Sequence, residues 1–425
     1  MTTHRRFLNH VSDRGRPVRV GIAGAGTVGA ELVRQVHRAP GMEVGAVVNR
    51  TLERARDALD VAGVDRADVA VVHDAAEARD AASRGRVVVC SSPDPLWELE
   101  DLDVVAEVTG AVGHGFRVMS RVLERGRDVV SMNAECDALL GPTLHRLAAS
   151  SGAVYTLADG DQPGVLFRLV DEVRGFGMEV VAALNCKRHL DVHQSPTDGE
   201  DYAGRDATSL RMTTAFGDGT KLQVEQACVA NALGFAVLRE GMTGLRTTLA
   251  DVAGDLVPHV ESAPGPFVDY TLGGDFGPGV VVVARLPGGA DDEQRTRLRM
   301  LKMGDGPLYA FFRPWHIVAF EMVTTLATVV MDRIPLAAPP GPSTARVVAR
   351  AKRDLPVGLA LDGQGGFDLY GVCALESTTG DRPPVGLLDD ALVQRPIRID
   401  APVTWEDVEV ADVDLLEVWR GQARR

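Results

Sequence analysis

The chain has 425 residues, of which 45% are hydrophobic and 24% charged, a balance typical of a globular protein with two or three domains. Its formal net charge of −14 argues against nucleic acid or an anionic membrane surface as a partner, because both repel a negative protein. No run of apolar residues approaches the roughly 18 that a membrane span needs. The five cysteines show no paired spacing. We therefore expect a cytoplasmic protein with reduced thiols that acts on a small molecule.

The first predicted element is an apolar strand that leads into a glycine-rich turn. Residues 17–36 read "PVRVGIAGAGTVGAELVRQV", with Gly24-x-Gly26-x-x-Gly29 between a strand pattern and a helical pattern. In this context Gly24 allows the tight turn, Gly26 lets the backbone approach a pyrophosphate, and Gly29 lets the helix pack on the strand. The helix N-terminus, with Thr27 and Val28, offers backbone N–H groups to the phosphates. The motif predicts a dinucleotide-binding unit.

The second predicted strand, residues 42–50, bears on the choice of cofactor. It ends in Asn49 and Arg50, with Arg54 one helical turn later. An acidic residue at this place usually holds the ribose 2′-hydroxyl of NAD, and here there is none. Asn49 and Arg50 are therefore predicted to contact the cofactor, with Arg50 and Arg54 pairing with the 2′-phosphate of NADPH. NADH is the alternative, if both arginines are only solvated residues at a helix start.

Strand-like stretches then alternate with helical ones as far as residue 175, which predicts a doubly wound parallel sheet. In such a sheet the ligand lies at the carboxyl ends of the strands. "EVTGAVGHG" places Thr109 and Gly110 there, beside the predicted nicotinamide ribose. "VVSMNAECD" places Asn133 and Glu135 at the same edge, where substrate and nicotinamide meet, and "LADGDQPG" adds Asp161. We therefore expect Asn133, Glu135 and Asp161 to be catalytic residues, with Asn133 also contacting the cofactor. Glu135 has either a chemical role or a capping role, and we expect Asp137 to cap the following helix.

From residue 178 the pattern changes to that of a second, α+β domain. "MEVVAALNCKRH" starts as an apolar strand and ends in Lys187, Arg188 and His189, a cationic cluster suited to a phosphorylated or carboxylated substrate. Lys187 is also placed to protonate an oxygen as a hydride reaches its carbon. A surface run of the same residue types is the alternative. Farther on, residues 217–219 (Gly-Asp-Gly) predict a hairpin turn between alternating runs.

These patterns divide the chain into four parts. Residues 1–16 are an N-terminal extension, residues 17–175 an NAD(P)-binding Rossmann domain, and residues 176–334 a substrate and oligomerisation domain. The last helix of the substrate domain is expected to return to the Rossmann domain near residues 317–331. The proline-rich "PLAAPPGPS" opens residues 335–425, which read as a linker and a small all-β unit.

Several stretches in one order resemble a known family along nearly the whole chain. They are "RPVRVGIAGAGTVG", "VVSMNAECDALLGP", "YTLADGDQPG", "NCKRH", "KMGDGPLYAFFRPWH" and "AKRDLPVGLALDG". With them the chain resembles the 1-deoxy-D-xylulose 5-phosphate reductoisomerase-like (DRL) proteins, which are homoserine-dehydrogenase-like oxidoreductases with a C-terminal SAF domain. Homo-oligomers, dimers or tetramers, are common in this class.

The resemblance implies an NADPH-dependent reduction, coupled in the named members to rearrangement of a phosphorylated ketose. It implies that Lys187 is a base or substrate anchor and that Glu135 and Asp161 surround the reacting carbons. Homoserine dehydrogenases have a lysine shortly after the Asn of the corresponding strand end, where this chain has Ala134 and Glu135. Gln162 also stands where an acidic residue is expected after Asp161. The missing lysine argues against simple homoserine reduction, whereas Gln162 is a departure in the other direction and leaves open whether this chain uses the substrate of the DRL-like family.

The predicted reaction has several forms. A rearrangement needs an alkoxide and an enediolate to be stabilised, either by Mg²⁺ or Mn²⁺ held by Glu135 and Asp161 or by Lys187 as a fixed cation. A homoserine- or semialdehyde-type dehydrogenase without rearrangement is the second reading. Its variant uses Cys136 as a nucleophile near a helix start. The third is a non-catalytic nucleotide-binding protein.

Overall fold

The computed structural model describes residues 3–198, 209–274, 276 and 278–422. The chain forms two compact units: unit 1 comprises Met1–Gly164 and Ile317–Ala338, and unit 2 comprises Val165–His316 and Pro339–Arg425. The first boundary therefore falls at 164/165 rather than 175/176, and residues 339–425 belong to the same compact unit as the predicted substrate domain. Within the described ranges, no helix has both the length and the apolar character that crossing a bilayer requires.

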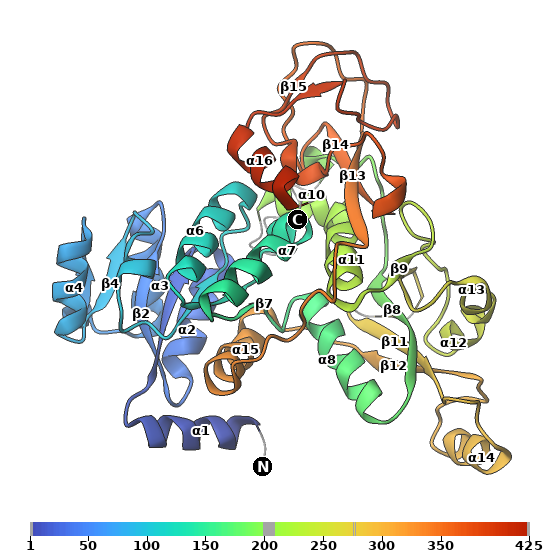
Figure 1. Cartoon of the computed structure of the whole chain (residues 1–425), viewed down its shortest axis with the longest axis horizontal. Helices are drawn as coiled ribbons and strands as arrows, with labels where there is room; N and C mark the ends of the chain where they lie inside the picture. Colours follow the sequence, from blue (N-terminus) through green and yellow to red (C-terminus); the bar gives the residue numbers. More distant parts are fainter. Residues whose placement is uncertain (1–2, 199–208, 275, 277, 423–425) are drawn as a thin grey trace. The chain divides into compact units, whose positions relative to one another are not determined.

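Unit 1 is built on a seven-stranded parallel sheet in the order β3-β4-β2-β1-β5-β6-β7; Figure 1 labels its strands β2, β4 and β7. The predicted doubly wound sheet is confirmed. Its strands are β1 Val18–Ala23, β2 Met42–Val48, β3 Val69–Val71, β4 Val87–Cys90, β5 Val104–Glu107, β6 Asp128–Ser131 and β7 Tyr155–Leu157. Its helices are α1 Thr3–Arg14, α2 Thr27–Arg38, α3 Leu52–Ala62, α4 Ala75–Ser83, α5 Pro95–Glu98, α6 Val112–Glu124, α7 Ala134–Ser151 and α15 Val318–Asp332, with a 3-10 turn at Arg66–Asp68.

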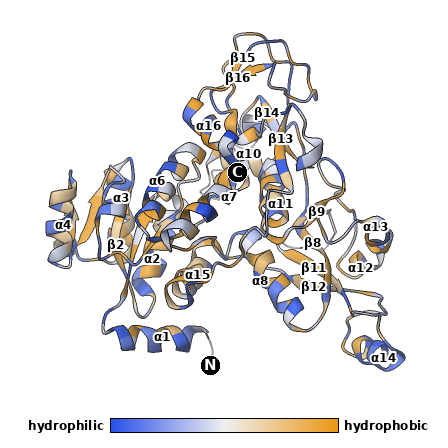
Figure 2. Ribbon diagram, viewed as in Figure 1, coloured by the Kyte–Doolittle hydropathy of each residue, from blue (hydrophilic) through white to orange (hydrophobic). Residues whose placement is uncertain are grey.

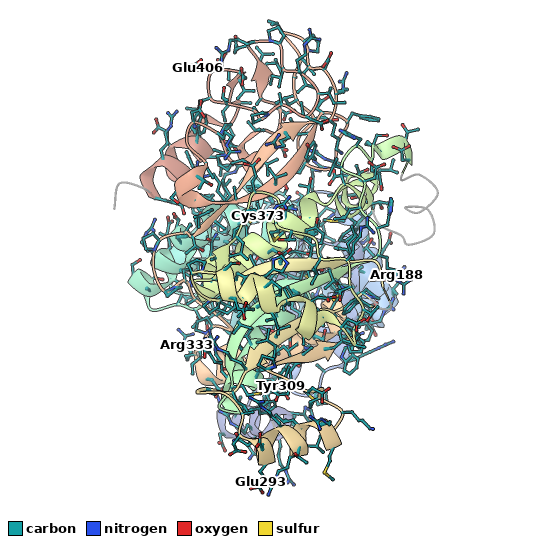
Figure 3. The ribbon with its side chains drawn as sticks, turned by 90° about the vertical axis from the view of Figure 1, so that its right-hand side faces the viewer. Arg188, Glu293, Tyr309, Arg333, Cys373 and Glu406 are labelled. Carbon is teal, nitrogen blue, oxygen red and sulfur yellow. The ribbon has the colours of Figure 1, made fainter. Side chains whose placement is uncertain are left out.

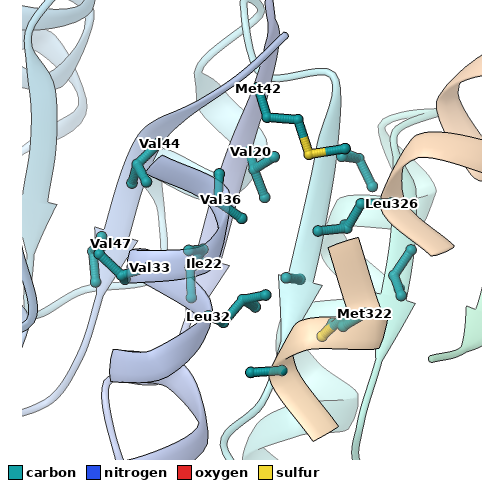
Figure 4. Packing of buried hydrophobic residues seen from close by; sticks show 14 of the residues in the cluster. Val20, Ile22, Leu32, Val33, Val36, Met42, Val44, Val47, Met322 and Leu326 are labelled. Carbon is teal, nitrogen blue, oxygen red and sulfur yellow. The ribbon is translucent and has the colours of Figure 1, made fainter. Parts of the chain in front are cut away.

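Apolar residues on both faces of the strands hold this sheet together. The central strands are almost wholly buried because the crossover helices cover the sheet, so they read as continuous valine-rich runs. The late helix α15 packs beside α2, and its Met322 and Leu326 join the core of Val20, Ile22 and Leu32 (Figure 4). The Thr325 hydroxyl oxygen of α15 accepts a 2.9 Å hydrogen bond from the Asp159 N–H, so α15 also fixes the loop after β7.

Unit 2 contains a five-stranded mixed sheet in the order β12-β11-β8-β10-β9. β8 pairs in parallel with β10 and antiparallel with β11, and β12 forms an edge. The strands are β8 Glu179–Lys187, β9 Ala236–Val237, β10 Phe267–Leu272, β11 Val280–Arg285 and β12 Leu308–Arg313. The helices of this unit are α8 Gln162–Gly175, α10 Leu210–Gly217, α11 Thr220–Leu233, α12 Val252–Asp255, α13 Val257–Ser262 and α14 Asp292–Met300. The first residues of α8 belong to unit 1. Helix α14 is strongly hydrophilic (Figure 2).

The predicted hairpin at residues 217–219 is wrong, because this segment joins two helices, α10 and α11. The Asp218 N–H still donates to Thr214 of α10, while an Asp218 carboxylate oxygen accepts from Thr220 N–H at 2.7 Å and starts α11. Gly219 supplies the left-handed φ of +84° at the junction. All residues from Thr220 to Asn231 are buried, so α11 lacks the polar face that would have marked it as a helix.

The C-terminal part of unit 2 contains two short antiparallel pairs, β13–β14 and β15–β16. Their bounds are β13 Ala345–Ala351, β14 Leu369–Leu375, β15 Leu392–Val393 and β16 Val408–Glu409, with 3-10 turns at Glu376–Thr378 and Val385–Leu387. An all-β segment was expected, but the chain ends in helix α16, Val413–Gln422, whose first turn is capped by Asp412 through Leu415 N–H at 3.0 Å. The assignment of this part as an SAF-like domain stays a prediction.

Candidate functional site

The residues predicted to bind the cofactor lie together at the carboxyl edge of the unit 1 sheet. β1 lies between β2 and β5, so the chain changes direction across the sheet at β1. In open parallel sheets the ligand binds at this point, beyond the strand ends. The glycine loop follows β1, Asn49 and Arg50 follow β2, and Thr109 and Gly110 follow β5.

The glycine loop has the geometry of a phosphate-binding turn. Gly24 has φ +105°, which favours glycine strongly. A Cβ on Gly29 would lie 2.0 Å from the Gly24 carbonyl oxygen, so helix α2 can approach β1 only with glycine here. A Cβ on Gly26 would meet nothing within 4 Å, so the space beside this residue is open. Thr27 and Val28 open α2 directly after this loop, where backbone N–H groups and the helix dipole favour an anion.

Asn49 and Arg50 were both predicted to contact the cofactor, but the structure places their side chains in different surroundings. The Asn49 side chain accepts from Ala25 N–H at 3.0 Å and donates to the Thr51 carbonyl at 2.8 Å, so it ties the glycine loop to the end of β2. Arg50 is exposed. Burial, followed by the charges of Arg117 and Arg50, lowers the pKa of His114 at the start of α6. Positive charge therefore gathers at this edge, where a ribose phosphate needs it.

A buried carboxylate that sequence analysis did not single out organises the next part of the edge. Glu107, the last residue of β5, accepts from Thr109 N–H at 2.9 Å, from the Thr109 hydroxyl and from the Ser131 hydroxyl at 3.3 Å. Burial raises the pKa of its carboxyl, against the opposing effect of these hydrogen bonds. Glu107 thereby fixes the turn of Thr109 and Gly110, the latter at φ +68°. An acidic residue closing an apolar strand is the signal that could have identified it.

Asn133 caps a helix, a role that the sequence analysis gave to Asp137. Its carboxamide oxygen accepts from Cys136 N–H at 3.0 Å, its amide nitrogen donates to the Ala111 carbonyl at 3.2 Å, and it also bonds to Glu107. Asp137 instead accepts from the buried Tyr155 hydroxyl at 3.0 Å. With its side chain buried and engaged in this way, Asn133 holds the loops of the edge in place.

Cys136 is unsuited to the role of nucleophile that the variant of the dehydrogenase reading gave it. Its side chain is fully buried in α7. Burial, and then the charges of Glu107, Asp137 and Glu135, raise the pKa of its thiol well above the ordinary value. Because the thiolate is the reactive form, this environment is that of a packed, inert cysteine.

Glu135 and Asp161 follow two adjacent strands of the sheet, β6 and β7. Glu135 lies in the first turn of α7 and Asp161 directly precedes α8, and both are partly exposed. Among the described residues, no group of three or more His, Cys, Asp or Glu side chains is arranged to hold a metal ion. The two carboxylates alone therefore form no preassembled metal centre.

The predicted cationic cluster lies in unit 2, at the end of β8. Lys187 is partly buried, and its Nζ lies 5.4 Å from the centroid of the Phe216 ring, a cation–π contact. Its carbonyl accepts from Gly273 N–H at 2.8 Å, which fixes the backbone at this strand end. Arg188 and His189 are exposed, and Arg188 is labelled in Figure 3. The cluster thus offers one positioned ammonium and two side chains open to solvent.

A buried polar cluster on α11 lies on the same face of the sheet as Lys187. Asn185 donates a 2.9 Å hydrogen bond to Glu225, and Lys221 Nζ lies 3.9 Å from the other Glu225 oxygen. Cys186, between Asn185 and Lys187, faces the opposite apolar side with Val252. Side chains alternate along a strand, so Lys187 and Asn185 share the α11 face. Sequence analysis missed Lys221 and Glu225 because it did not assign α11 as a helix.

Comparison with known proteins gives two family matches in chain order. Residues 24–157 match the model of the homoserine dehydrogenase NAD-binding domain, and residues 160–322 match that of the catalytic domain of oxidoreductase DRL. No curated protein matches the chain.

Solved structures with a similar arrangement include three named enzymes. A probable dehydrogenase from Thermotoga maritima is 11% identical, with a TM-score of 0.44, over 75% of this chain and 90% of the other. 1-Deoxy-D-xylulose 5-phosphate reductoisomerase from Zymomonas mobilis, solved with NADPH, is 13% identical, with a TM-score of 0.40, over 75% and 81%. A myo-inositol dehydrogenase from Corynebacterium glutamicum is 11% identical, with a TM-score of 0.42, over 75% and 89%.

The family matches agree with what the two units contain. The first covers the glycine loop and the strand ends that follow it, and the second covers β8 with Lys187 and α11. The resemblance found in the sequence is confirmed for these two domains, and the SAF domain that it includes stays a prediction. The chain therefore joins a segment similar to the homoserine dehydrogenase NAD-binding domain to one similar to the catalytic domain of oxidoreductase DRL, and it is an NAD(P)-dependent oxidoreductase.

Proposed function

We propose that the chain is an NADPH-dependent reductase of a small ketose or aldehyde that carries a phosphate or carboxylate. The observation that carries this proposal is the end of β8, where the positioned Lys187 is followed by the exposed cations Arg188 and His189. This strand end lies within the segment that matches the DRL catalytic domain. Arg188 and His189 suit the anionic end of a substrate, and Lys187 suits its carbonyl oxygen.

In this proposal NADPH supplies the hydride, and the chain's residues bind, orient and move protons. The N-terminus of α2 holds the pyrophosphate and Arg50 pairs with the 2′-phosphate. Glu107 and Asn133 keep the Thr109–Gly110 turn in place beside the nicotinamide ribose. Lys187 donates a proton to the carbonyl oxygen as negative charge develops there. Glu135 and Asp161 are the carboxylates available for a further proton transfer.

Two extensions of this function stay predictions. A reductoisomerase would first rearrange the carbon chain, with Mg²⁺ or Mn²⁺ held by Glu135, Asp161 and a substrate phosphate, since magnesium is often bound by one or two carboxylates together with phosphate. A homoserine- or semialdehyde-type dehydrogenase needs neither step. The observation that favours this second candidate is the match of residues 24–157 to the homoserine dehydrogenase NAD-binding domain.

A substrate panel tests the proposal and separates the candidates. We expect the purified chain to oxidise NADPH, followed at 340 nm, with at least one phosphorylated or carboxylated ketose or aldehyde, and the product skeleton, determined by NMR, to show whether rearrangement occurs. A chelator such as EDTA abolishes turnover if a metal takes part and has no effect on the plain dehydrogenase. Tight NADPH binding without oxidation across the panel would instead identify a non-catalytic nucleotide-binding protein.

Replacing Arg50 by Asp reverses the cofactor preference. The substitution removes a cation that pairs with the 2′-phosphate and adds a carboxylate that accepts from the ribose 2′-hydroxyl of NADH. A hydrogen bond to a charged group contributes about 1.5–3 kcal/mol, so the Kd for NADPH should rise by about 10- to 150-fold. Fluorescence titration with both cofactors measures it. Arg66→Asp, an exposed change farther along unit 1, is the control, and equal weakening of both cofactors would contradict the assignment.

Compartment and assembly complete the proposal. All five cysteines are buried and none is in a disulfide, the state that a reducing compartment maintains, and this supports the predicted cytoplasmic location. A homo-oligomer, as a dimer or tetramer, stays a prediction that sedimentation velocity of the purified chain would test.

A further inference from the structure

A buried lysine in the C-terminal part of unit 2 joins three segments that are far apart in the sequence. Lys352 follows β13, and its Nζ donates to the Gln194 carbonyl and the Gly366 carbonyl, each at 2.7 Å. It also forms a 2.7 Å ion pair with Asp218 at the junction of α10 and α11. The side chains of Lys352 and Asp218 are 2% and 0% exposed. The Lys352 ammonium thus has two carbonyl oxygens and one carboxylate oxygen, from three different segments, each 2.7 Å away.

Two of these segments carry residues of the candidate substrate site. Gln194 belongs to residues 188–198, which directly follow Lys187 and include Arg188 and His189. Asp218 follows α10, whose Phe216 ring lies beside the Lys187 ammonium. The Gly217 carbonyl also accepts from Asp191 N–H at 2.9 Å, so the two segments are bonded to each other. A displacement at Lys352 would therefore reach both the strand-end loop and the ring that orients Lys187.

A second contact from the C-terminal part holds the same loop from its exposed side. His193 Nε2 lies 2.8 Å from an Asp400 carboxylate oxygen, and the Tyr370 hydroxyl donates to this oxygen at 3.1 Å. The His193 and Tyr370 rings meet edge to face, with centroids 6.1 Å apart. Residues 188–198 are thus held at Gln194 from the buried side and at His193 from the exposed side.

The choice of a charged residue at position 352 points to a geometric role. Replacing a buried ion pair by apolar side chains of similar volume often keeps or improves stability, so stability alone does not require a lysine here. An apolar side chain cannot bond three acceptors at once. We infer that Lys352 is a positioning residue of the substrate site and that the C-terminal part of unit 2 completes this site by fixing residues 188–198 and the α10–α11 junction. The inference rests on the proposed function for its effect on catalysis.

The test uses the full-length chain with Lys352→Met and with the double variant Lys352→Met/Asp218→Asn. The double variant removes both charges together, so no lone buried charge opposes folding. Asp400→Asn loosens the exposed contact, and asparagine tolerates the left-handed φ of +61° at this position. Asp354→Asn is the matched control, because Asp354 is an exposed carboxylate of the same C-terminal part that bonds Arg398 and Ile399 within it.

We expect amide hydrogen exchange in residues 188–198 to accelerate by about tenfold or more in both Lys352 variants, and less in Asp400→Asn. We expect the KM for the carbonyl substrate to rise by about tenfold or more, since small displacements of positioning groups are costly. The Kd for NADPH and the behaviour of Asp354→Asn should stay as in the parent chain. A folded double variant with parental exchange in residues 188–198, or with faster exchange but parental KM, would overturn the inference. If the parent chain turns over no substrate, the proposed function fails, and the exchange rates alone decide whether Lys352 fixes the loop.

Discussion

Replacing Lys187 by Met should lower kcat by about 10²- to 10⁴-fold, the range that positioned general acids contribute. The reason is that Lys187 is the ammonium positioned at the end of β8, by Phe216 on one side and by the hydrogen bond from Gly273 to its carbonyl. Without it, the negative charge that develops on the carbonyl oxygen loses its proposed proton donor. The Kd for NADPH should stay unchanged, because the predicted cofactor residues all belong to unit 1.

The Lys187→Arg variant distinguishes the effect of the positive charge at this position from the effect of proton donation. A guanidinium keeps the positive charge but does not give up its proton near neutral pH. The arginine variant should therefore recover much of the substrate affinity while kcat stays low. Arg188→Met should show the opposite pattern, a higher KM with kcat nearly retained, because its proposed role is to bind the substrate anion.

Steady-state kinetics and cofactor titration check these expectations together. Arg285→Met is the control, because Arg285 pairs with Glu179 at the other end of β8, and both side chains are about half exposed. A Lys187→Met variant that loses NADPH affinity, or that keeps its kcat, would contradict the role given to Lys187.

The sheet of unit 1 could be predicted from the sequence because the pattern that indicates each strand lies in a few consecutive residues. Each strand is a short apolar run, covered on both faces and followed by a helix, so the alternation itself indicates a parallel sheet. The glycine loop could also be predicted, because Gly24 and Gly29 are required by backbone geometry that any sequence of this fold must satisfy.

The direction of a polar side chain could not be predicted in the same way. Asn133 has the position expected of a residue facing the ligand, yet its side chain turns inward to cap α7. A cap and a ligand contact require the same residue type at the same strand end, so the sequence does not distinguish them. Glu107 was missed for a related reason: its partners Thr109 and Ser131 come from the turn after β5 and from the end of β6.

The predictions for unit 2 failed in two places: where a helix is buried on every side, and where the residues in contact are far apart in the sequence. α11 is enclosed on all faces, and its buried Lys221 and Glu225 obscure the usual helical periodicity. Lys352 depends on Gln194, Asp218 and Gly366, three positions that no local pattern connects. Where a side chain is positioned by partners from separate segments, the sequence alone does not indicate its role.

The largest effect in unit 1 is expected from Gly29→Ala, and Gly26→Ala is its matched comparison. The new Cβ at residue 29 would lie 2.0 Å from the Gly24 carbonyl oxygen, so α2 has to move away from β1. Overpacking of this kind costs about 1–3 kcal/mol, and displacing a backbone N–H from the pyrophosphate costs a charge-assisted hydrogen bond of about 1.5–3 kcal/mol. Both the thermal stability and the NADPH affinity should therefore fall, the affinity by about tenfold or more.

Gly26→Ala should lower only the affinity. Gly26 has φ −75°, which alanine adopts readily, and its Cβ would meet nothing within 4 Å. The free chain should keep its stability or gain slightly, because alanine restricts the unfolded state. The methyl group would instead occupy the space through which a pyrophosphate approaches the backbone. Thermal unfolding with and without NADPH measures both quantities, with the exposed Gly175→Ala at the end of α8 as a control. A Gly26→Ala variant with parental NADPH affinity would mean that the cofactor does not lie along this loop, because a methyl group placed between the backbone and a bound pyrophosphate cannot leave their contact unchanged.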